Sequence, residues 1–270
     1  MDRYASFPPA DLAPLVDRFW GWRSAPGETT RLAPHAPGVG AELIFHLGAP
    51  FPTAAGPLPV AHVLAMRTCL LEFGDARDLD FVAIRFRSGA LRHVLVGPAR
   101  DIPEGTPDAT EIWGAGLVRL LERLGEASTF SDRVRLLAAW LRIERDRHSR
   151  PDAAVDRAIA SLYSDPADSR IDTVARTVGL GPRQLERRFD AAVGLGPKRF
   201  ERLARAYKLV RAQALEPGQP YLPRALDLGY YDQAHAIHDL RELTGMAPTA
   251  LFGELAAGSH FYNLSAPSRP

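Results

Sequence analysis

The sequence predicts an α+β protein: a β-rich, barrel-like N-terminal domain, a helical linker, and an all-α domain with two helix-turn-helix motifs. Short apolar stretches separated by Pro- and Gly-rich turns fill the first part of the chain, a pattern typical of β-strands. Apolar positions then recur at helical spacing towards the C-terminus. Two glycine turns in that part each separate a short apolar helix from an amphipathic one. We expect boundaries at residues 1–115, 116–150, 151–257 and a tail at 258–270.

Length and composition bound the class of protein. A chain of 270 residues suits two ordinary domains, and 46% hydrophobic with 24% charged residues is globular composition. No apolar run approaches the ~20 residues of a membrane helix, and the first residues show no secretory signal. The one cysteine, Cys69, excludes an internal disulfide and a multi-cysteine metal site. We therefore expect a cytoplasmic protein without membrane contact.

The N-terminal elements follow from their apolar runs. Strands are expected at 41–47, 61–66 and 81–86, and residues 12–22 form a first helix or strand with its aromatic side chains turned inward. Trp20, Trp22 and Trp113 either line a ligand pocket or fill the core, and the core is favoured. In the linker, helical spacing is found at 117–124 and at 131–145. These two helices either pair between subunits or brace the two domains.

Candidate chemistry in the N-terminal half is weak. His35, Glu42 and His46 are the ligand types of a metal-binding cupin, but they lack the close His-x-His pair that clamps one ion. Cys69 is a reactive thiol or, more simply, a buried apolar residue. No Ser-His-Asp elbow, phosphate loop or catalytic carboxylate pair stands out. We therefore expect no enzyme activity, no metal and no cofactor.

The first helix-turn-helix motif is expected at 171–193. A short apolar helix leads into a turn around Gly179, and Pro182 suits the first position of the next helix. Residues near the start of a recognition helix reach base edges: Arg pairs with guanine, Gln with adenine, and Glu accepts from cytosine. The candidate base-reading residues are therefore Arg183, Gln184, Glu186 and Arg187.

An uninterrupted helix is expected at 197–215, with an apolar seam at 3, 4, 3, 4 spacing. Its basic side chains lie off this seam. Those nearest its start, Lys198, Arg199 and Arg202, are candidates for phosphate contacts. Pairing of other basic residues on this helix with acidic neighbours is the alternative.

The second motif is expected at 222–244. Gly229 lies in its turn, and Asp232 can cap the following helix through its carboxylate. The groove-facing candidates are Gln233, His235 and His238.

Charge separates the two motifs. Residues 170–211 hold eleven Lys and Arg against four Asp and Glu, a balance of +7, whereas residues 212–258 hold two against six, a balance of −4. A basic block of this density is expected of a surface that contacts phosphates. The first motif and the connecting helix should therefore dominate DNA affinity.

The segment from about Asp152 to Leu255 resembles the DNA-binding domain of the AraC/XylS transcription regulators, through VARTVGLGPRQLERRF, GLGPKRFERLARA, LGYYDQAH and TGMAPTAL. The resemblance implies seven helices, recognition helices at about 182–193 and 233–244 in successive major-groove turns of double-stranded DNA, and recruitment or obstruction of RNA polymerase. It also implies an N-terminal domain that senses a small-molecule effector or forms a homodimer.

Departures from the family occur in the second motif, where Ala236 and Leu240 replace larger residues and His238 often has arginine as its counterpart. We therefore expect the second motif to be less tightly packed than the first. The alternative functions are a metal- or small-molecule-binding sensor or enzyme with weak DNA binding, and a protein-interaction adaptor.

Overall fold

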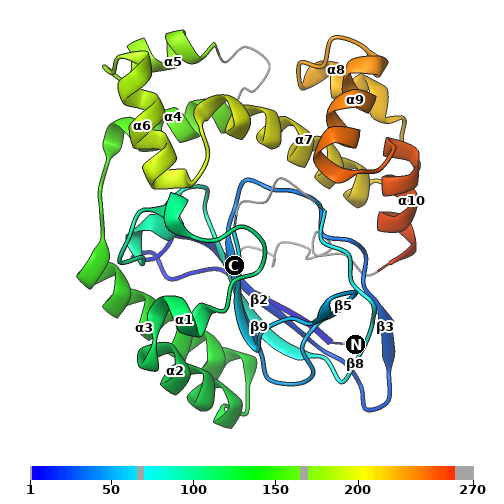
Figure 1. Ribbon diagram of the computed structural model, residues 1–270. Coiled ribbons are helices and arrows are strands. Elements are labelled where there is room, and N and C mark those ends of the chain that lie inside the picture. The colour runs from blue at the N-terminus through cyan, green and yellow to red at the C-terminus, as the bar shows by residue number, and fades with distance from the viewer. Residues whose placement is uncertain (1, 66–69, 165–169, 259–270) are drawn as a thin grey trace.

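The computed structural model describes residues 2–65, 70–164 and 170–258. The N-terminal half is built on one antiparallel sheet with the strand order β1-β2-β9-β4-β7 (Figure 1). Its strands are β1 (Asp2–Ser6), β2 (Val16–Arg23), β4 (Glu42–His46), β7 (Ala61–Leu64) and β9 (Asp80–Phe86). Two small ribbons accompany it: β3 (Thr29–Arg31) with β8 (Asp75–Arg77), and β5 (Pro52–Thr53) with β6 (Gly56–Pro57).

The three predicted strands are confirmed, but the barrel-like closure is not. Among the described residues β1 pairs only with β2 in the main sheet, and β7 only with β4, so the sheet is open. The segment 12–22, expected as helix or strand, is a turn followed by β2.

The sheet is buried on both faces because its strands carry apolar side chains at successive positions. Along β4, Leu43 and Phe45 enter one core while Ile44 enters the other, as the two-residue period of a strand requires. Trp20 and Trp22 are buried in the second core, so the core interpretation of these two tryptophans is confirmed.

Three helices follow the sheet: α1 (Ala109–Trp113), α2 (Ala115–Glu126) and α3 (Phe130–His148). The last two confirm the helices predicted for the linker. Leu117, Leu124 and Leu141 are fully buried and belong to the same core as Leu43 and Phe45. The linker helices thus pack onto the sheet of the N-terminal half.

The C-terminal half contains seven helices in its described part, as the family resemblance implied: α4 (Ala153–Ser164), α5 (Ile171–Thr177), α6 (Pro182–Val193), α7 (Pro197–Leu215), α8 (Tyr221–Asp227), α9 (Gln233–Thr244) and α10 (Pro248–Ala257). The long helix α7 runs between the α5–α6 pair and the α8–α9 pair (Figure 1). Gly179 and Gly229 have φ of 75° and 85° in the two turns, a conformation that glycine adopts without steric cost. Pro182 begins α6 and Asp232 accepts a hydrogen bond from the backbone N of His235 at 2.8 Å, both as predicted.

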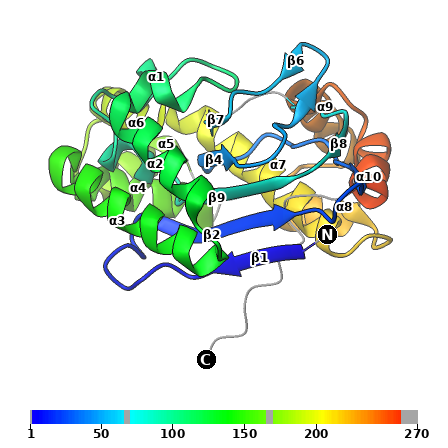
Figure 2. The ribbon, with the colours of Figure 1, turned by 90° about the horizontal axis from the view of Figure 1, so that it is seen from below.

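The two halves share a packed boundary, with the sheet lying below α7 in Figure 1 and in front of it in the view from below (Figure 2). Ala33, Ala36 and Val39, from the loop before β4, are part of the core of the C-terminal half. Two 3₁₀ turns of the N-terminal half, η1 (Ala90–His93) and η2 (Ala99–Asp101), contact α6. None of the helices in the described part of the chain is long and apolar enough to cross a membrane.

Candidate nucleic-acid interface and interdomain pocket

The first recognition helix presents a basic face at its N-terminus. Leu185 and Phe189 are fully buried against the helical core, which turns the other side of α6 outward. All four predicted base-reading residues of this helix are exposed: Arg183, Gln184, Glu186 and Arg187. The structure therefore brings them to one accessible surface.

Helix α6 is fixed in place by contacts on its inner side. The Arg188 guanidinium donates to the two carboxylate oxygens of Asp152 at 2.5 and 2.9 Å, and Asp152 also accepts from the backbone N of Val155 at the start of α4. The rings of Phe189 and Phe200 meet edge to face at 5.3 Å. A recognition helix held this way keeps its exposed side chains at fixed positions relative to α7.

The second recognition helix also exposes its candidates. Gln233, His235 and His238 are exposed, while Ala236 and Leu240 are fully buried. These polar side chains are partly engaged. The Nδ1 atom of His235 accepts from the backbone N of Tyr231 at 3.2 Å, and the second histidine, His238, lies 3.7 Å from Glu242.

A polar network that the sequence did not reveal holds α9 against α7. Arg202 donates to Asp239 and, at 2.8 and 2.7 Å, to both carboxylate oxygens of Glu242. The hydroxyl of Tyr230 donates to Asp239 at 2.8 Å, and Arg205 lies 5.2 Å over the Tyr230 ring. Burial, together with the charge of Asp239, raises the pKa of Tyr230, so its phenol remains a donor at every physiological pH.

This network gives Arg202 a structural role, and its predicted phosphate contact stays a prediction. The predicted phosphate contact would require breaking its pairs with Asp239 and Glu242. Lys198 and Arg199 remain exposed at the start of α7, although Lys198 pairs with Glu201 at 2.7 Å. Arg202 is therefore a link between helices in this structure.

The candidate metal ligands of the N-terminal half are not brought together as a site. Glu42 is buried in an ion pair with Arg85, and His35 contacts the carbonyl of Ala36 at 3.0 Å. His46 is buried beside aromatic rings, with Phe51 at 4.4 Å between ring centroids. The described ranges contain no group of three or more His, Cys, Asp or Glu suited to a metal ion. Cys69 lies outside the described residues.

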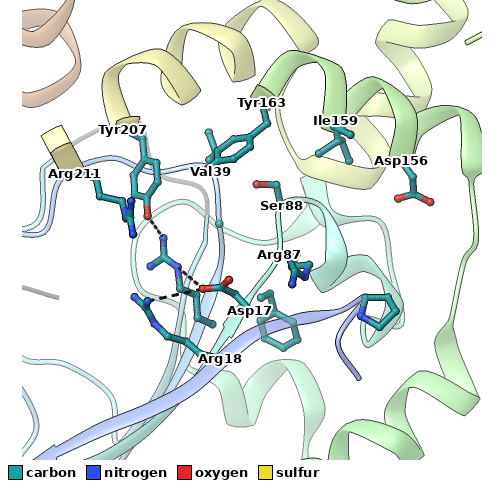
Figure 3. Close-up of a pocket in the computed structure, with 15 residues that line it drawn as sticks. Asp17, Arg18, Val39, Arg87, Ser88, Asp156, Ile159, Tyr163, Tyr207 and Arg211 are labelled. Carbon is teal, nitrogen blue, oxygen red and sulfur yellow. Dashed lines mark hydrogen bonds and ion pairs between the residues drawn. The ribbon is translucent and has the colours of Figure 1, made fainter. Parts of the chain in front are cut away.

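A pocket of about 450 Å³ lies between the two halves (Figure 3). One wall comes from the sheet side: the start of β2, the loop before β4 and the end of β9. The other comes from α4 and α7. Its lining residues are Pro14, Asp17, Arg18, Val39, Gly40, Arg85, Phe86, Arg87, Ser88, Asp156, Ile159, Ala160, Tyr163, Tyr207 and Arg211. No spacing pattern in the sequence indicates this pocket, because its residues come from five separate segments.

One buried arginine connects the two walls of this pocket. Arg85, on β9, pairs with Glu42 on β4 and donates to the Tyr207 hydroxyl on α7 at 2.6 Å. The Arg85 guanidinium also lies 5.5 Å over the Tyr207 ring. Asp17 lies 4.0 Å from both Arg85 and Arg18. The sheet is thereby hydrogen-bonded to α7, the helix that connects the two helix-turn-helix motifs.

Comparison with known sequences finds one family. Residues 174–253 match the family profile described as "Helix-turn-helix domain". This range contains most of the first motif and all of the second. No curated protein sequence matches the chain significantly.

Comparison with solved structures finds similar chains at low sequence identity. A transcriptional regulator from Chromobacterium violaceum, described as AraC-type DNA-binding domain-containing, is 20% identical over 38% of this chain and 92% of its own, with a TM-score of 0.35. ToxT from Vibrio cholerae O395 is 10% identical over 88% of this chain and 97% of its own, with a TM-score of 0.47. ToxT bound to (E)-4-(8-methylnaphthalen-1-yl)but-3-enoic acid is 8% identical over 94% of this chain and 100% of its own, with a TM-score of 0.49. Likenesses this distant transfer no ligand or residue role to the present chain.

Proposed function

We propose that the protein is a DNA-binding transcription regulator of the AraC type, in which the helix-turn-helix match at residues 174–253 is the DNA-binding part, and that α6 and α9 read successive segments of one DNA major groove. The observation that carries this proposal is the exposed face of α6. Arg183 and Arg187 make no hydrogen bond or ion pair with any described residue, on a helix whose inner side is fixed by Arg188 and Phe189. Both guanidiniums are thus available for bidentate contacts to guanine.

The two helices contribute unequally in this proposal. The region of α6 and α7 carries the positive balance, while the region of α8 and α9 is acidic. On α9 the candidate side chains are an amide and two imidazoles, one of them already hydrogen-bonded to the backbone. The α6 half of the site therefore supplies most of the affinity, Lys198 and Arg199 add phosphate contacts, and α9 adjusts specificity.

Control by the N-terminal half is the second part of the proposal. Arg85 joins the sheet to α7 through Tyr207, and Arg92 of η1 joins it to α4 through Asp156 at 2.5 Å. A change at this boundary alters where α4 and α7 lie relative to the sheet. The regulator then acts on transcription by recruiting or obstructing RNA polymerase, with a homodimer as the form to be tested.

Selection of binding sites from random DNA tests the reading of DNA. The full-length protein should enrich one motif with two separated elements, because two recognition helices engage. Arg187→Ala should relax one base position in one element and lower affinity about 10- to 100-fold, the equivalent of ~1–3 kcal/mol.

The matched control is Arg119→Ala, which removes an exposed arginine of α2 on the N-terminal half. It should leave the motif unchanged. A wild-type protein that enriches no motif would point to the adaptor function instead, and equal effects of the two substitutions would contradict the assignment of α6.

A further inference from the structure

We propose that the interdomain pocket binds a small dianionic molecule, a dicarboxylate or a phosphate ester, held between Arg18 on the sheet wall and Arg211 on α7. This inference rests on the proposed regulatory function and names the chemistry of its effector. The pocket volume of about 450 Å³ lies in the range of ~300–1,000 Å³ typical of small-molecule sites.

The lining is cationic. Four arginines, Arg18, Arg85, Arg87 and Arg211, face two aspartates, a formal balance of +2. Two charged residues lie just behind the walls: Glu42, which pairs with Arg85, and Arg92, which pairs with Asp156. Their opposite charges cancel, so the balance of the pocket is unchanged. A concave cationic surface with apolar flanks concentrates anions.

Arg18 is poorly compensated for a buried charge. Its side chain is only 16% exposed, and its Nε finds no hydrogen-bond acceptor among the described residues. Its nearest carboxylate, Asp17, is 4.0 Å away and shared with Arg85. Burial, followed by the charge of Arg85, lowers the pKa of Arg18. An anion placed beside Arg18 would offset its charge and relieve the repulsion between the two guanidiniums.

The second cation comes from the opposite wall. Arg211, on α7, is exposed and has no ion pair within the described part of the chain. Arg18 and Arg211 come from different walls but lie near the same end of the pocket, with Tyr207 near Arg211 (Figure 3). A guanidinium fork matches one carboxylate or one face of a phosphate. Two forks on different walls therefore favour a ligand with two negative charges.

Apolar residues are available to contact the carbon skeleton of the ligand. Val39, Phe86, Ile159 and the Tyr163 ring flank the charged groups, which suits a short carbon skeleton. Because one arginine belongs to the sheet and the other to α7, a bridging dianion stabilises one arrangement of the halves. Binding of the dianion and of DNA are then coupled, and the coupling is reciprocal.

The experiment uses full-length protein and isothermal titration at constant ionic strength. The probes are succinate and glycerol 3-phosphate as dianions, with acetate and decanoate as monoanions. We expect at least one dianion to bind ten or more times tighter than both monoanions. Arg18→Gln and Arg211→Gln should each weaken that binding at least tenfold, whereas Arg119→Gln on α2 should not. Because Arg211 is exposed, its substitution tests the pocket even if Arg18→Gln does not fold.

The selected DNA site provides the second readout. A saturating dianion should change the DNA affinity of the wild type at least fivefold and that of Arg211→Gln less than twofold. Absence of dianion binding, or equal binding of acetate, would overturn the pocket assignment, and tighter binding of decanoate would assign the pocket to long-chain acids. Arginine-dependent dianion binding with no response in DNA affinity would overturn the coupling. Failure of the regulatory function itself is separate, because it appears as a wild type that selects no DNA motif.

Discussion

Acidification should destabilise the N-terminal half through His46. This side chain is 4% exposed, neither ring nitrogen has a hydrogen-bond partner among the described residues, and its ring stacks on that of His62 at 5.1 Å between centroids. Burial, followed by the charge that His62 would carry, lowers the pKa of His46 from 6.5 to about 3. The folded protein therefore keeps this imidazole neutral where the unfolded chain protonates it.

The size of the effect follows from the difference between the two pKa values. Stability is retained above pH 6.5 and falls as the pH drops from 6.5 towards 3, because only the unfolded chain takes up the proton. At ~1.36 kcal/mol per pH unit, the loss at pH 5 amounts to about 2 kcal/mol. That is a substantial part of the ~5–15 kcal/mol of a typical domain.

Urea unfolding followed by tryptophan fluorescence measures this loss selectively. All four tryptophans, Trp20, Trp22, Trp113 and Trp140, lie in the N-terminal half, so the signal reports on that half alone. The comparison is with His46→Phe, which keeps a flat ring beside Phe51. Between pH 7 and pH 5 the wild type should lose about 2 kcal/mol more than the variant. Parallel pH profiles for the two proteins would refute the reasoning.

Three further predictions concern the C-terminal half. Arg202→Ala should destabilise α9 by about 1.5–3 kcal/mol, because a buried carboxylate loses its charged donor. Footprinting should then show protection lost only in the α9 element, whereas a uniform loss of protection would support the phosphate contact instead. Arg187→Ala should weaken operator binding more than Gln233→Ala in fluorescence anisotropy, and the reverse order would contradict the unequal roles of the two motifs. Tyr207→Phe removes the hydrogen bond from Arg85 across the domain boundary. The unfolding free energy should therefore fall by about 1.5–3 kcal/mol, and the operator affinity should change. If neither the unfolding free energy nor the operator affinity changed, this contact would not couple the halves.

Local signals account for what the sequence predicted correctly. The turn at Gly179, the start of α6 at Pro182 and the cap at Asp232 depend on residues close in the chain. Their dihedral preferences and capping chemistry act within one helical turn. The buried side of α6, with Leu185 and Phe189, likewise follows from helical spacing alone.

Distant pairings account for what the sequence did not predict. Arg202 and Asp239 are 37 positions apart, and Arg85 and Tyr207 are 122 apart. Nothing in the spacing of basic residues along α7 distinguishes a phosphate contact from a link between helices. The open sheet is a similar case, because closure depends on which edge strands meet and not on the pattern within a strand.

The central claim is that α6 and α9 read successive major-groove segments of one duplex. Dimethyl sulfate protection on the selected site tests it most directly, because the reagent reports guanine N7 in the major groove. Two protected clusters about 10–10.5 base pairs apart are expected, with the α6 cluster lost in Arg187→Ala. A single protected cluster, or two clusters unaffected by that substitution, would contradict it.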